Sequence, residues 1–253
     1  MLESYLKARL NDREILLMTH IVLGYPTFED SFRIIETMVE AGVDLMELQI
    51  PFSEPIADGP VILHANQQSL AAGTRVDQCF EFARKVTETF PIPFLFMSYY
   101  NILYKFGVER FAAAMAKDRL RGAIVPDLPP EEGQDYLQAM ESHNLAPVFI
   151  FSPTTTDERM NYIASFARGF VYCVARKGVT GLDTSFSQHL GKYLDRCRAA
   201  TDLPLALGFG VKDREDVDFL KGKADIAVIG TQTIRLMDKD GVGAVRDFIG
   251  GLR

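Results

Sequence analysis

The chain has 253 residues, of which 47% are hydrophobic and 24% charged, values typical of a folded globular protein and not of a disordered one. Its 27 Lys and Arg against 34 Asp and Glu give a formal net charge of −7, which opposes non-specific binding to nucleic acid or anionic lipid. Three widely spaced cysteines form no Cys-x-x-Cys pair, which fits a reducing compartment and argues against a zinc site. Since no apolar run approaches the length of a membrane span or a secretory segment, we expect a cytoplasmic protein.

Short apolar runs alternate with segments of helical periodicity, a pattern typical of repeated βα units around a parallel sheet. A helix is predicted over residues 2–10, ahead of the first apolar run. Farther along, Phe28, Phe32, Ile35 and Val39 have the spacing of one helical face. Eight apolar runs are predicted to be buried strands, at residues 16–23, 43–50, 94–97, 122–125, 147–151, 169–175, 203–207 and 225–229.

Eight predicted strands with helices between them favour a closed (β/α)8 barrel, the TIM barrel, over an open doubly wound sheet. The chain length suits this fold, because one such barrel typically needs about 250 residues. No linker, low-complexity stretch or short repeat interrupts the pattern, so we expect a single domain over residues 1–253. In this fold the active site lies at the carboxyl ends of the strands, which is where polar residues should be sought.

The second predicted strand carries a carboxylate among apolar residues. Val43, Leu45, Glu47 and Gln49 alternate along this strand and therefore share one face, which places Glu47 and Gln49 at the barrel mouth if that face points inward. Partial burial disfavours the charged form of a carboxyl group and suits it to acid or base catalysis near neutral pH. The alternative is a structural glutamate in an ion pair. The loop that follows adds further polar groups, including Asp58, and favours the functional interpretation.

Glycines follow each of the last three predicted strands: Gly178 and Gly181, then Gly208 and Gly210, then Gly230. Glycines allow backbone amides to approach an anion, and the next helix begins at Gly230-Thr231, where its amino end carries partial positive charge. These positions indicate a phosphorylated ligand, bound without a basic cluster, and we interpret the mixed-charge run 212–216 as a solvated helix start. A carboxylate opposite a phosphate suits an isomerase, an epimerase or an aldolase-type lyase equally well.

Residues 47–60, ELQIPFSEPIADGP, closely resemble the ELGIPFSDPLADGP signature of tryptophan synthase α subunits. Further stretches resemble landmarks of the same family and occur in the same order along nearly the whole chain: LGYP at 23–26, SYYN at 98–101, PDLP at 126–129, SPTT at 152–155, GFVY at 169–172, GVTG at 178–181 and LGFG at 207–210. An ordered set of this kind is far more specific than any single motif.

The resemblance implies a TIM barrel that cleaves indole-3-glycerol phosphate to indole and glyceraldehyde 3-phosphate. This is a retro-aldol reaction that needs neither metal nor organic cofactor, and the family's partner is a β subunit in an α2β2 complex. Glu47 matches the catalytic acid and base, and Asp58 matches the aspartate that bonds the indole N–H. Tyr172 matches a tyrosine near the glycerol part of the substrate.

The resemblance also implies residues for the phosphate group and for a mobile loop. Those that match the phosphate pocket are Gly181, Phe209, Gly210, Gly230 and Thr231, where Thr231 replaces the usual serine. Arg176 and Thr180 match a loop that closes over the substrate, and Asp127 matches an aspartate that communicates with Thr180.

The sequence departs from the family pattern at the expected substrate pocket, to which we assign His20, Gln49 and Met97. Gln49 stands where the family has glycine, so its side chain is expected to enter the space of the indole ring. His20 replaces an aromatic residue and is either a hydrogen-bonded structural histidine or an acid or base beside Glu47. Val22 replaces a threonine in the same strand.

Two further departures, Glu54 for aspartate and Ile102 for proline, affect the region that faces the β subunit in the family. Three hypotheses therefore stay open. The chain is an indole-3-glycerol phosphate lyase, or a paralogue that acts on another phosphorylated substrate, or a weakly catalytic subunit that activates a β partner.

Overall fold

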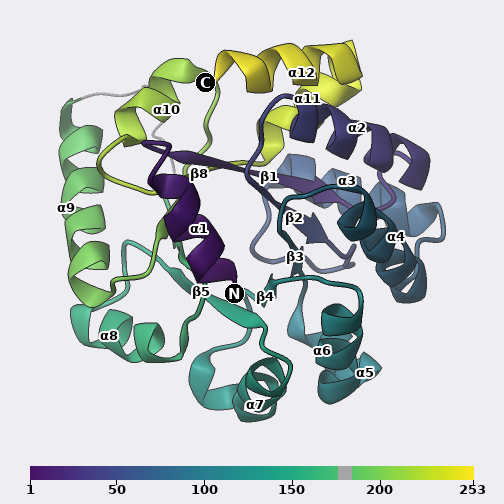
Figure 1. Ribbon diagram of the computed structural model, residues 1–253, viewed down its shortest axis with the longest axis horizontal. Helices are drawn as coiled ribbons and strands as arrows, with labels where there is room; N and C mark the ends of the chain where they lie inside the picture. The colour runs from purple at the N-terminus through teal and green to yellow at the C-terminus, as the bar shows by residue number, and fades with distance from the viewer. Residues whose placement is uncertain (176–183) are drawn as a thin grey trace.

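The computed structural model describes residues 1–175 and 184–253, which form a closed barrel of eight parallel strands in the order β1 to β8 (Figure 1). The expected barrel is therefore confirmed. The strands are β1 (Leu16–Val22), β2 (Leu45–Gln49), β3 (Phe94–Met97), β4 (Gly122–Ile124), β5 (Ala146–Phe151), β6 (Val171–Val174), β7 (Leu205–Gly208) and β8 (Ile226–Ile229). β6 begins two residues later than predicted, because Gly169 has a φ of +81° and interrupts the extended backbone.

Helices surround the barrel and connect successive strands. They are α1 (Leu2–Leu10), α2 (Phe28–Glu40), α3 (Pro60–Ala71), α4 (Val76–Thr89), α5 (Tyr100–Phe106), α6 (Val108–Lys117), α7 (Gln134–Ser142), α8 (Asp157–Phe166), α9 (Thr184–Ala200), α10 (Arg214–Leu220), α11 (Thr231–Asp240) and α12 (Val242–Gly251), with a short 3-10 helix, η1 (Pro130–Glu132). The N-terminal helix has the predicted bounds.

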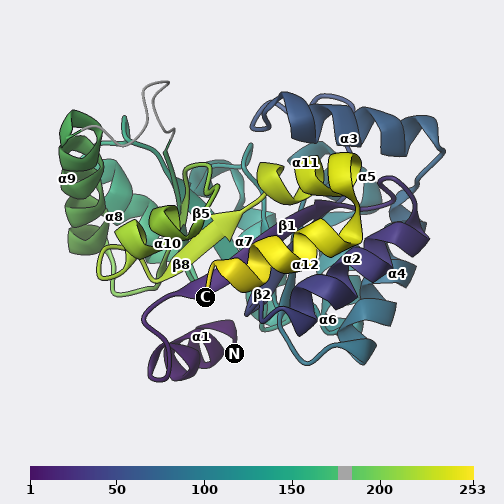
Figure 2. The same ribbon diagram turned by 90° about the horizontal axis from the view of Figure 1, so that it is seen from above.

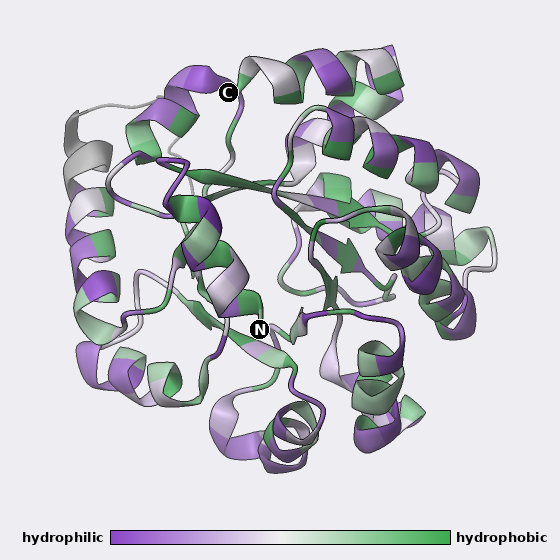
Figure 3. Cartoon of the chain, viewed as in Figure 1, coloured by the Kyte–Doolittle hydropathy of each residue, from purple (hydrophilic) through white to green (hydrophobic). Residues whose placement is uncertain are grey.

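Helix α2 illustrates how local sequence sets these elements. The Thr27 side chain caps the helix by accepting a hydrogen bond from the Asp30 backbone N–H at 3.1 Å. The predicted apolar face packs against the barrel, with Ile35 fully buried. Figure 3 shows the same division throughout the molecule, because the strands are mainly hydrophobic and the hydrophilic residues lie on the helices and loops.

Apolar residues form two concentric layers. The outer layer lies between the strands and the helices, and the inner layer fills the barrel with side chains such as Leu16, Leu45 and Leu95. Leu2 and Leu6 of α1 join the inner layer, so α1 closes the end of the barrel at which the strands begin. Figure 2 shows α1 at this end and α3 at the opposite end, where the strands terminate.

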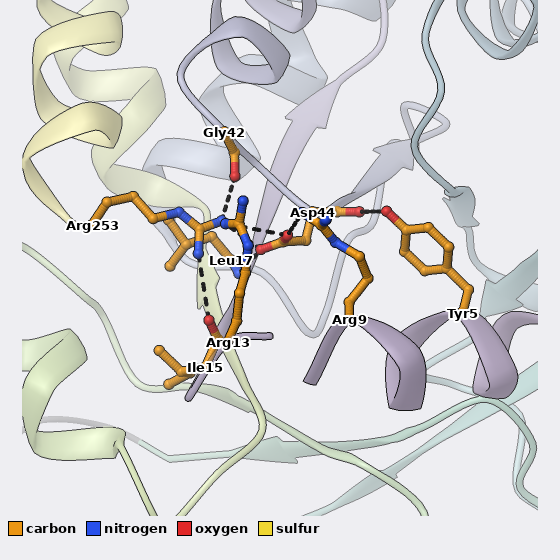
Figure 4. A network of polar contacts seen from close by, with 8 residues as sticks. All are labelled: Tyr5, Arg9, Arg13, Ile15, Leu17, Gly42, Asp44 and Arg253. Atoms are coloured by element: carbon orange, nitrogen blue, oxygen red, sulfur yellow. Dashed lines mark hydrogen bonds and ion pairs between the residues drawn. The ribbon is translucent and has the colours of Figure 1, made fainter. Parts of the chain in front are cut away.

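The closed end also holds a network of polar contacts around Asp44, a residue with no exposed surface (Figure 4). One carboxylate oxygen accepts a hydrogen bond from Arg9 at 2.9 Å and lies 3.5 Å from Arg13. The other oxygen accepts from the backbone N–H of Leu17 at 2.9 Å and from the guanidinium of Arg253. This network joins α1, the start of β1, the start of β2 and the last residue of the chain.

Candidate active site

A cavity of about 380 Å³ opens at the carboxyl ends of the strands, opposite α1. From the strands and the residues directly after them, its walls contain His20, Glu47, Met97, Ile124, Pro126, Ile150, Tyr172, Val174, Gly208, Gly210, Val228 and Gly230. The loops and helices add Ala57, Asp58, Gly59, Ile62, Val211, Lys212, Thr231, Gln232 and Arg235. The cavity is thus apolar in its interior, with a few polar groups that converge on it, as small-molecule sites usually are.

Glu47 lies in the middle of β2 and is 4% exposed, with its side chain at the cavity wall. His20 occupies the adjacent position of β1, because the two strands pair in a register that places these residues side by side. The imidazole Nδ1 lies 3.2 Å from Glu47 Oε1. Burial by itself lowers the pKa of His20, but the hydrogen bond and the negative charge of Glu47 outweigh burial and raise it.

Asp58 faces the same cavity from the loop between β2 and α3, and it is held by two donors. Its Oδ2 accepts hydrogen bonds from Gln49 Nε2 at 2.6 Å and from the Tyr99 hydroxyl at 3.2 Å. The Tyr99 hydroxyl also accepts from the backbone N–H of Ala57 at 3.1 Å and so fixes the loop. Burial raises the pKa of Asp58, whereas the two donors favour its ionised form and act in the opposite direction.

Tyr172 of β6 contributes a hydroxyl group to the cavity. Burial raises its pKa well above the ordinary value, and the charges of Glu47 and Asp58 act in the same direction, so the phenol stays protonated. Its ring lies against Gly208 of the neighbouring strand, where a Cβ atom would come within 3.1 Å of the hydroxyl oxygen. Because Gly208 has no side chain, the Tyr172 ring has room to lie at this position.

A second part of the cavity wall is suited to an anion. Gly210 has a φ of +91°, a conformation that only glycine adopts without strain, and Gly230 caps the amino end of α11. Thr231 and Gln232 of the first helical turn line the cavity, so unpaired backbone N–H groups and the positive end of the helix dipole face it. A phosphate group fits this part of the cavity wall, formed by Gly210 and the amino end of α11 and called here the phosphate end.

The family model described as "Tryptophan synthase alpha chain" matches residues 6–247. The chain belongs to the tryptophan synthase α chain family. It is 65% identical to the tryptophan synthase alpha chain of Syntrophotalea carbinolica, over 100% of both chains. It is also 65% identical to that of Desulforapulum autotrophicum, again over 100% of both.

Solved structures agree with this assignment. A structure of Mycobacterium tuberculosis tryptophan synthase matches with a TM-score of 0.91 and 30% identity, covering 99% of this chain and 96% of that one. Tryptophan synthase subunit alpha from Legionella pneumophila matches with a TM-score of 0.90 and 29% identity, covering 99% and 96%. The chain is accordingly a carbon–carbon lyase of the tryptophan synthase α type, which cleaves indole-3-glycerol phosphate in tryptophan biosynthesis.

Most side chains expected at the site of this tryptophan synthase α chain lie at the cavity, but three that the structure describes do not line it. Gln49, which we expect to enter the indole space, is fully buried, does not line the cavity and donates a hydrogen bond to Asp58. Phe209 packs into the outer apolar layer. Asp127 accepts hydrogen bonds from the backbone N–H of Tyr100 at 2.9 and 3.1 Å and so caps the start of α5.

Three other expected residues, Arg176, Thr180 and Gly181, lie outside the described residues. Within residues 1–175 and 184–253, no group of three or more His, Cys, Asp or Glu side chains has the arrangement of a metal site. No helix in the same part of the chain has both the length and the hydropathy that crossing a membrane requires.

Sequence reasoning missed two cations at the phosphate end, Lys212 and Arg235. The run 212–216 is a solvated helix start as predicted, since α10 begins within it at Arg214 and residues 212–215 are exposed, but Lys212 also lines the cavity. A signal for Arg235 was present, because it stands four residues after Thr231 and therefore on the same face of α11.

Proposed function

We propose that Glu47 and Asp58 perform the retro-aldol cleavage of indole-3-glycerol phosphate in this chain. The observation that carries this assignment is their placement on one cavity, each with its own hydrogen-bond donors. The phosphate group of the substrate binds at Gly210 and the amino end of α11, with Lys212 and Arg235 at the rim. The indole ring then lies toward the carboxyl groups.

The chemistry requires one proton to move from oxygen to carbon. Glu47 gives a proton to the indole C3 atom, and its carboxylate then takes the proton of the glycerol C3′ hydroxyl as the carbon–carbon bond breaks. Asp58 accepts the indole N–H and stabilises the positive charge that the protonated ring carries. Tyr172 orients the glycerol portion with its protonated hydroxyl, since its phenol stays neutral over the working pH range.

The direct test is to incubate the purified chain with indole-3-glycerol phosphate and to follow the release of indole and glyceraldehyde 3-phosphate. We expect both products in equal amounts. A folded chain that releases neither product, but turns over another sugar phosphate, would instead support the second hypothesis, a paralogue whose pocket is changed by His20 and Gln49.

We further propose that the chain binds a tryptophan synthase β chain in an α2β2 complex and works in the cytoplasm. Two large apolar side chains are exposed after the carboxyl ends of β2 and β3, Ile56 at 81% and Tyr104 at 72%. Exposed apolar residues of this kind are typical of a protein contact.

The partner proposal is tested by size-exclusion chromatography of the two chains and by indole release with and without the β chain. We expect the two chains to elute together as one complex and the release of indole to be faster with the β chain than without it. Slow release by the free chain, together with strong activation of the β chain, would favour the third hypothesis, a regulatory subunit. Separate elution of the chains and unchanged rates would contradict the proposed assembly.

A further inference from the structure

Two residues that depart from the family pattern, His20 and Gln49, are neighbours in the structure and both contact the catalytic carboxyl groups. His20 lies against Glu47 through Nδ1 at 3.2 Å, and Gln49 holds Asp58 through Nε2 at 2.6 Å. Their other polar atoms, His20 Nε2 and Gln49 Oε1, are buried without a hydrogen-bond partner among the described residues. The two residues lie on the paired strands β1 and β2, where Gln49 is one of the groups that raise the pKa of His20.

These contacts place one cationic group between two acidic groups. Glu47, Asp58 and Gln49 are the groups that favour the protonated imidazole. Gly230, which directly follows the neighbouring strand β8, brings no charged side chain to this position, and a Cβ atom built there would lie 3.6 Å from His20 Cβ. Tyr172, across the barrel, interacts with the same two carboxyl groups but stays protonated. The four residues Glu47, His20, Gln49 and Asp58 are here called the mouth cluster.

We propose that His20 and Gln49 are positioning residues of one unit, in which His20 stores the exchangeable proton of Glu47 and Gln49 keeps Asp58 oriented as a carboxylate. This inference rests on the proposed roles of Glu47 and Asp58. It explains why glutamine stands at a position where the family has glycine. The glutamine amide donates to Asp58, a contact that glycine could not make.

The proton balance closes within the mouth cluster. In the resting site the imidazolium donates its Nδ1 proton to the Glu47 carboxylate, and the proton passes to Oε1. Glu47 then protonates the indole C3 atom and, as a carboxylate, accepts the proton of the C3′ hydroxyl. The O–H electron pair forms the aldehyde, the carbon–carbon pair returns to the ring, and Glu47 gives the proton back to His20.

The pH dependence of kcat tests His20. Because the pKa of His20 is raised above its ordinary value, the pair keeps its proton to higher pH than an ordinary histidine would and loses it as the pH rises further. In His20→Phe a carboxyl group must hold the proton alone, so the basic limb of the profile moves to lower pH. The acid limb moves to higher pH, since the imidazolium also favours ionised Asp58. At pH 8.5 we expect kcat to fall about tenfold to a hundredfold.

The matching variant for Gln49 is Gln49→Leu, which keeps the volume and removes the hydrogen bond to Asp58. Asp58 then holds its proton more tightly, so the acid limb moves to higher pH while the basic limb changes little. We expect about a tenfold loss of kcat at pH 5.5 and less than about a twofold loss at pH 8.5. His20→Asn, which keeps a donor near the Nδ1 position but no titratable charge, should show the same shift of the basic limb as His20→Phe.

Thr19→Val is the control variant, because Thr19 is the neighbour of His20 on β1 and its Oγ1 is also buried without a partner among the described residues. Its profile should match that of the wild type, and circular dichroism with thermal melting checks that every variant is folded. If the folded wild type releases no indole, the proposed function itself is wrong. If the wild type is active and both variants lose the same factor at every pH, only the roles of His20 and Gln49 are overturned.

Discussion

The two ends of the barrel each hold a buried carboxyl group with cationic neighbours, but the balance of charge differs. At the closed end, Asp44 faces three arginine side chains, and both of its oxygens accept hydrogen bonds. The arginines reach solvent, with side chains between 26% and 36% exposed, so their excess charge is hydrated. At the mouth, Glu47 and Asp58 share one imidazole and face an open cavity.

This difference shows how a buried carboxyl group serves a structural purpose at one end of the barrel and a chemical purpose at the other. A buried carboxylate with several hydrogen-bond donors, such as Asp44, fixes the neighbouring segments of the chain. The mouth cluster instead holds a titratable imidazole beside Glu47, the proposed catalytic carboxyl, at the wall of an open cavity, and this arrangement provides reactivity. The comparison predicts that substitutions at the mouth change rates and that substitutions at the closed end change the free energy of unfolding.

The largest effect is expected for Glu47→Gln, which removes the group that transfers the proton and keeps the side-chain volume. We expect kcat to fall about a thousandfold, equivalent to about 4 kcal/mol, with little change in the free energy of unfolding. Stopped assays of indole release measure the rate, and calorimetric titration with indole-3-glycerol phosphate should show that binding is kept. Near-normal turnover would remove Glu47 from its assigned role.

Asp44→Asn should produce the opposite result. The substitution leaves three arginine side chains facing an uncharged amide, and losing one partner of a buried ionic network typically costs about 3 kcal/mol. We expect a lower free energy of unfolding in urea and an unchanged kcat for the protein that remains folded. Arg33→Gln is a matched control, since the Arg33–Glu29 pair is exposed and its loss should cost less than about 1 kcal/mol.

Asp58→Asn should have an intermediate effect on the rate. The amide still fits between Gln49 and Tyr99 but no longer offers a negative charge to the indole N–H. We expect kcat/KM to fall about thirtyfold, equivalent to about 2 kcal/mol of transition-state stabilisation. Steady-state kinetics at pH 7.5 measure this loss. A fall in kcat/KM that came entirely from KM would assign Asp58 to substrate binding alone.

The smallest effect is expected for Arg235→Gln at the phosphate end. Arg235 is exposed, so its attraction to a phosphate group is screened and worth about 1 kcal/mol. We expect KM to rise about fivefold with kcat unchanged, and inorganic phosphate to inhibit more weakly. Lys239→Gln, on the same helix but absent from the cavity wall, is the control. Equal effects of the two variants would indicate that any positive charge on this helix attracts the phosphate at long range and that Arg235 makes no local contact with it.

The sequence predicted the barrel because its strands are buried runs whose order and spacing repeat. The helix at residues 2–10 and the strand Phe94–Met97 have the predicted bounds, since clear changes in polarity mark them. The start of β6 was placed too early because the backbone conformation of Gly169 is not visible in a hydropathy pattern. A single domain over residues 1–253 stays a prediction.

The site was predictable where strand alternation and motif position determine it. His20, Glu47 and Met97 face the cavity from successive strands, and Asp58 faces it from the motif loop. The position of Gln49 was not predictable, because its hydrogen bond joins it to a loop residue nine positions later.

The network at the closed end was equally hidden from the sequence. Its contacts join residues such as Asp44 and Arg253, which are 209 positions apart. Contacts of this kind depend on how the elements pack and have no local sequence signal.

The most direct test of the contrast between the two ends is to measure both kcat and the free energy of unfolding for Glu47→Gln and Asp44→Asn in one series. We expect a crossed result, in which Glu47→Gln loses about a thousandfold in kcat at nearly unchanged stability and Asp44→Asn loses about 3 kcal/mol of stability at unchanged kcat. If both variants lost stability and rate together, the separation of the two ends into a catalytic and a structural region would be contradicted.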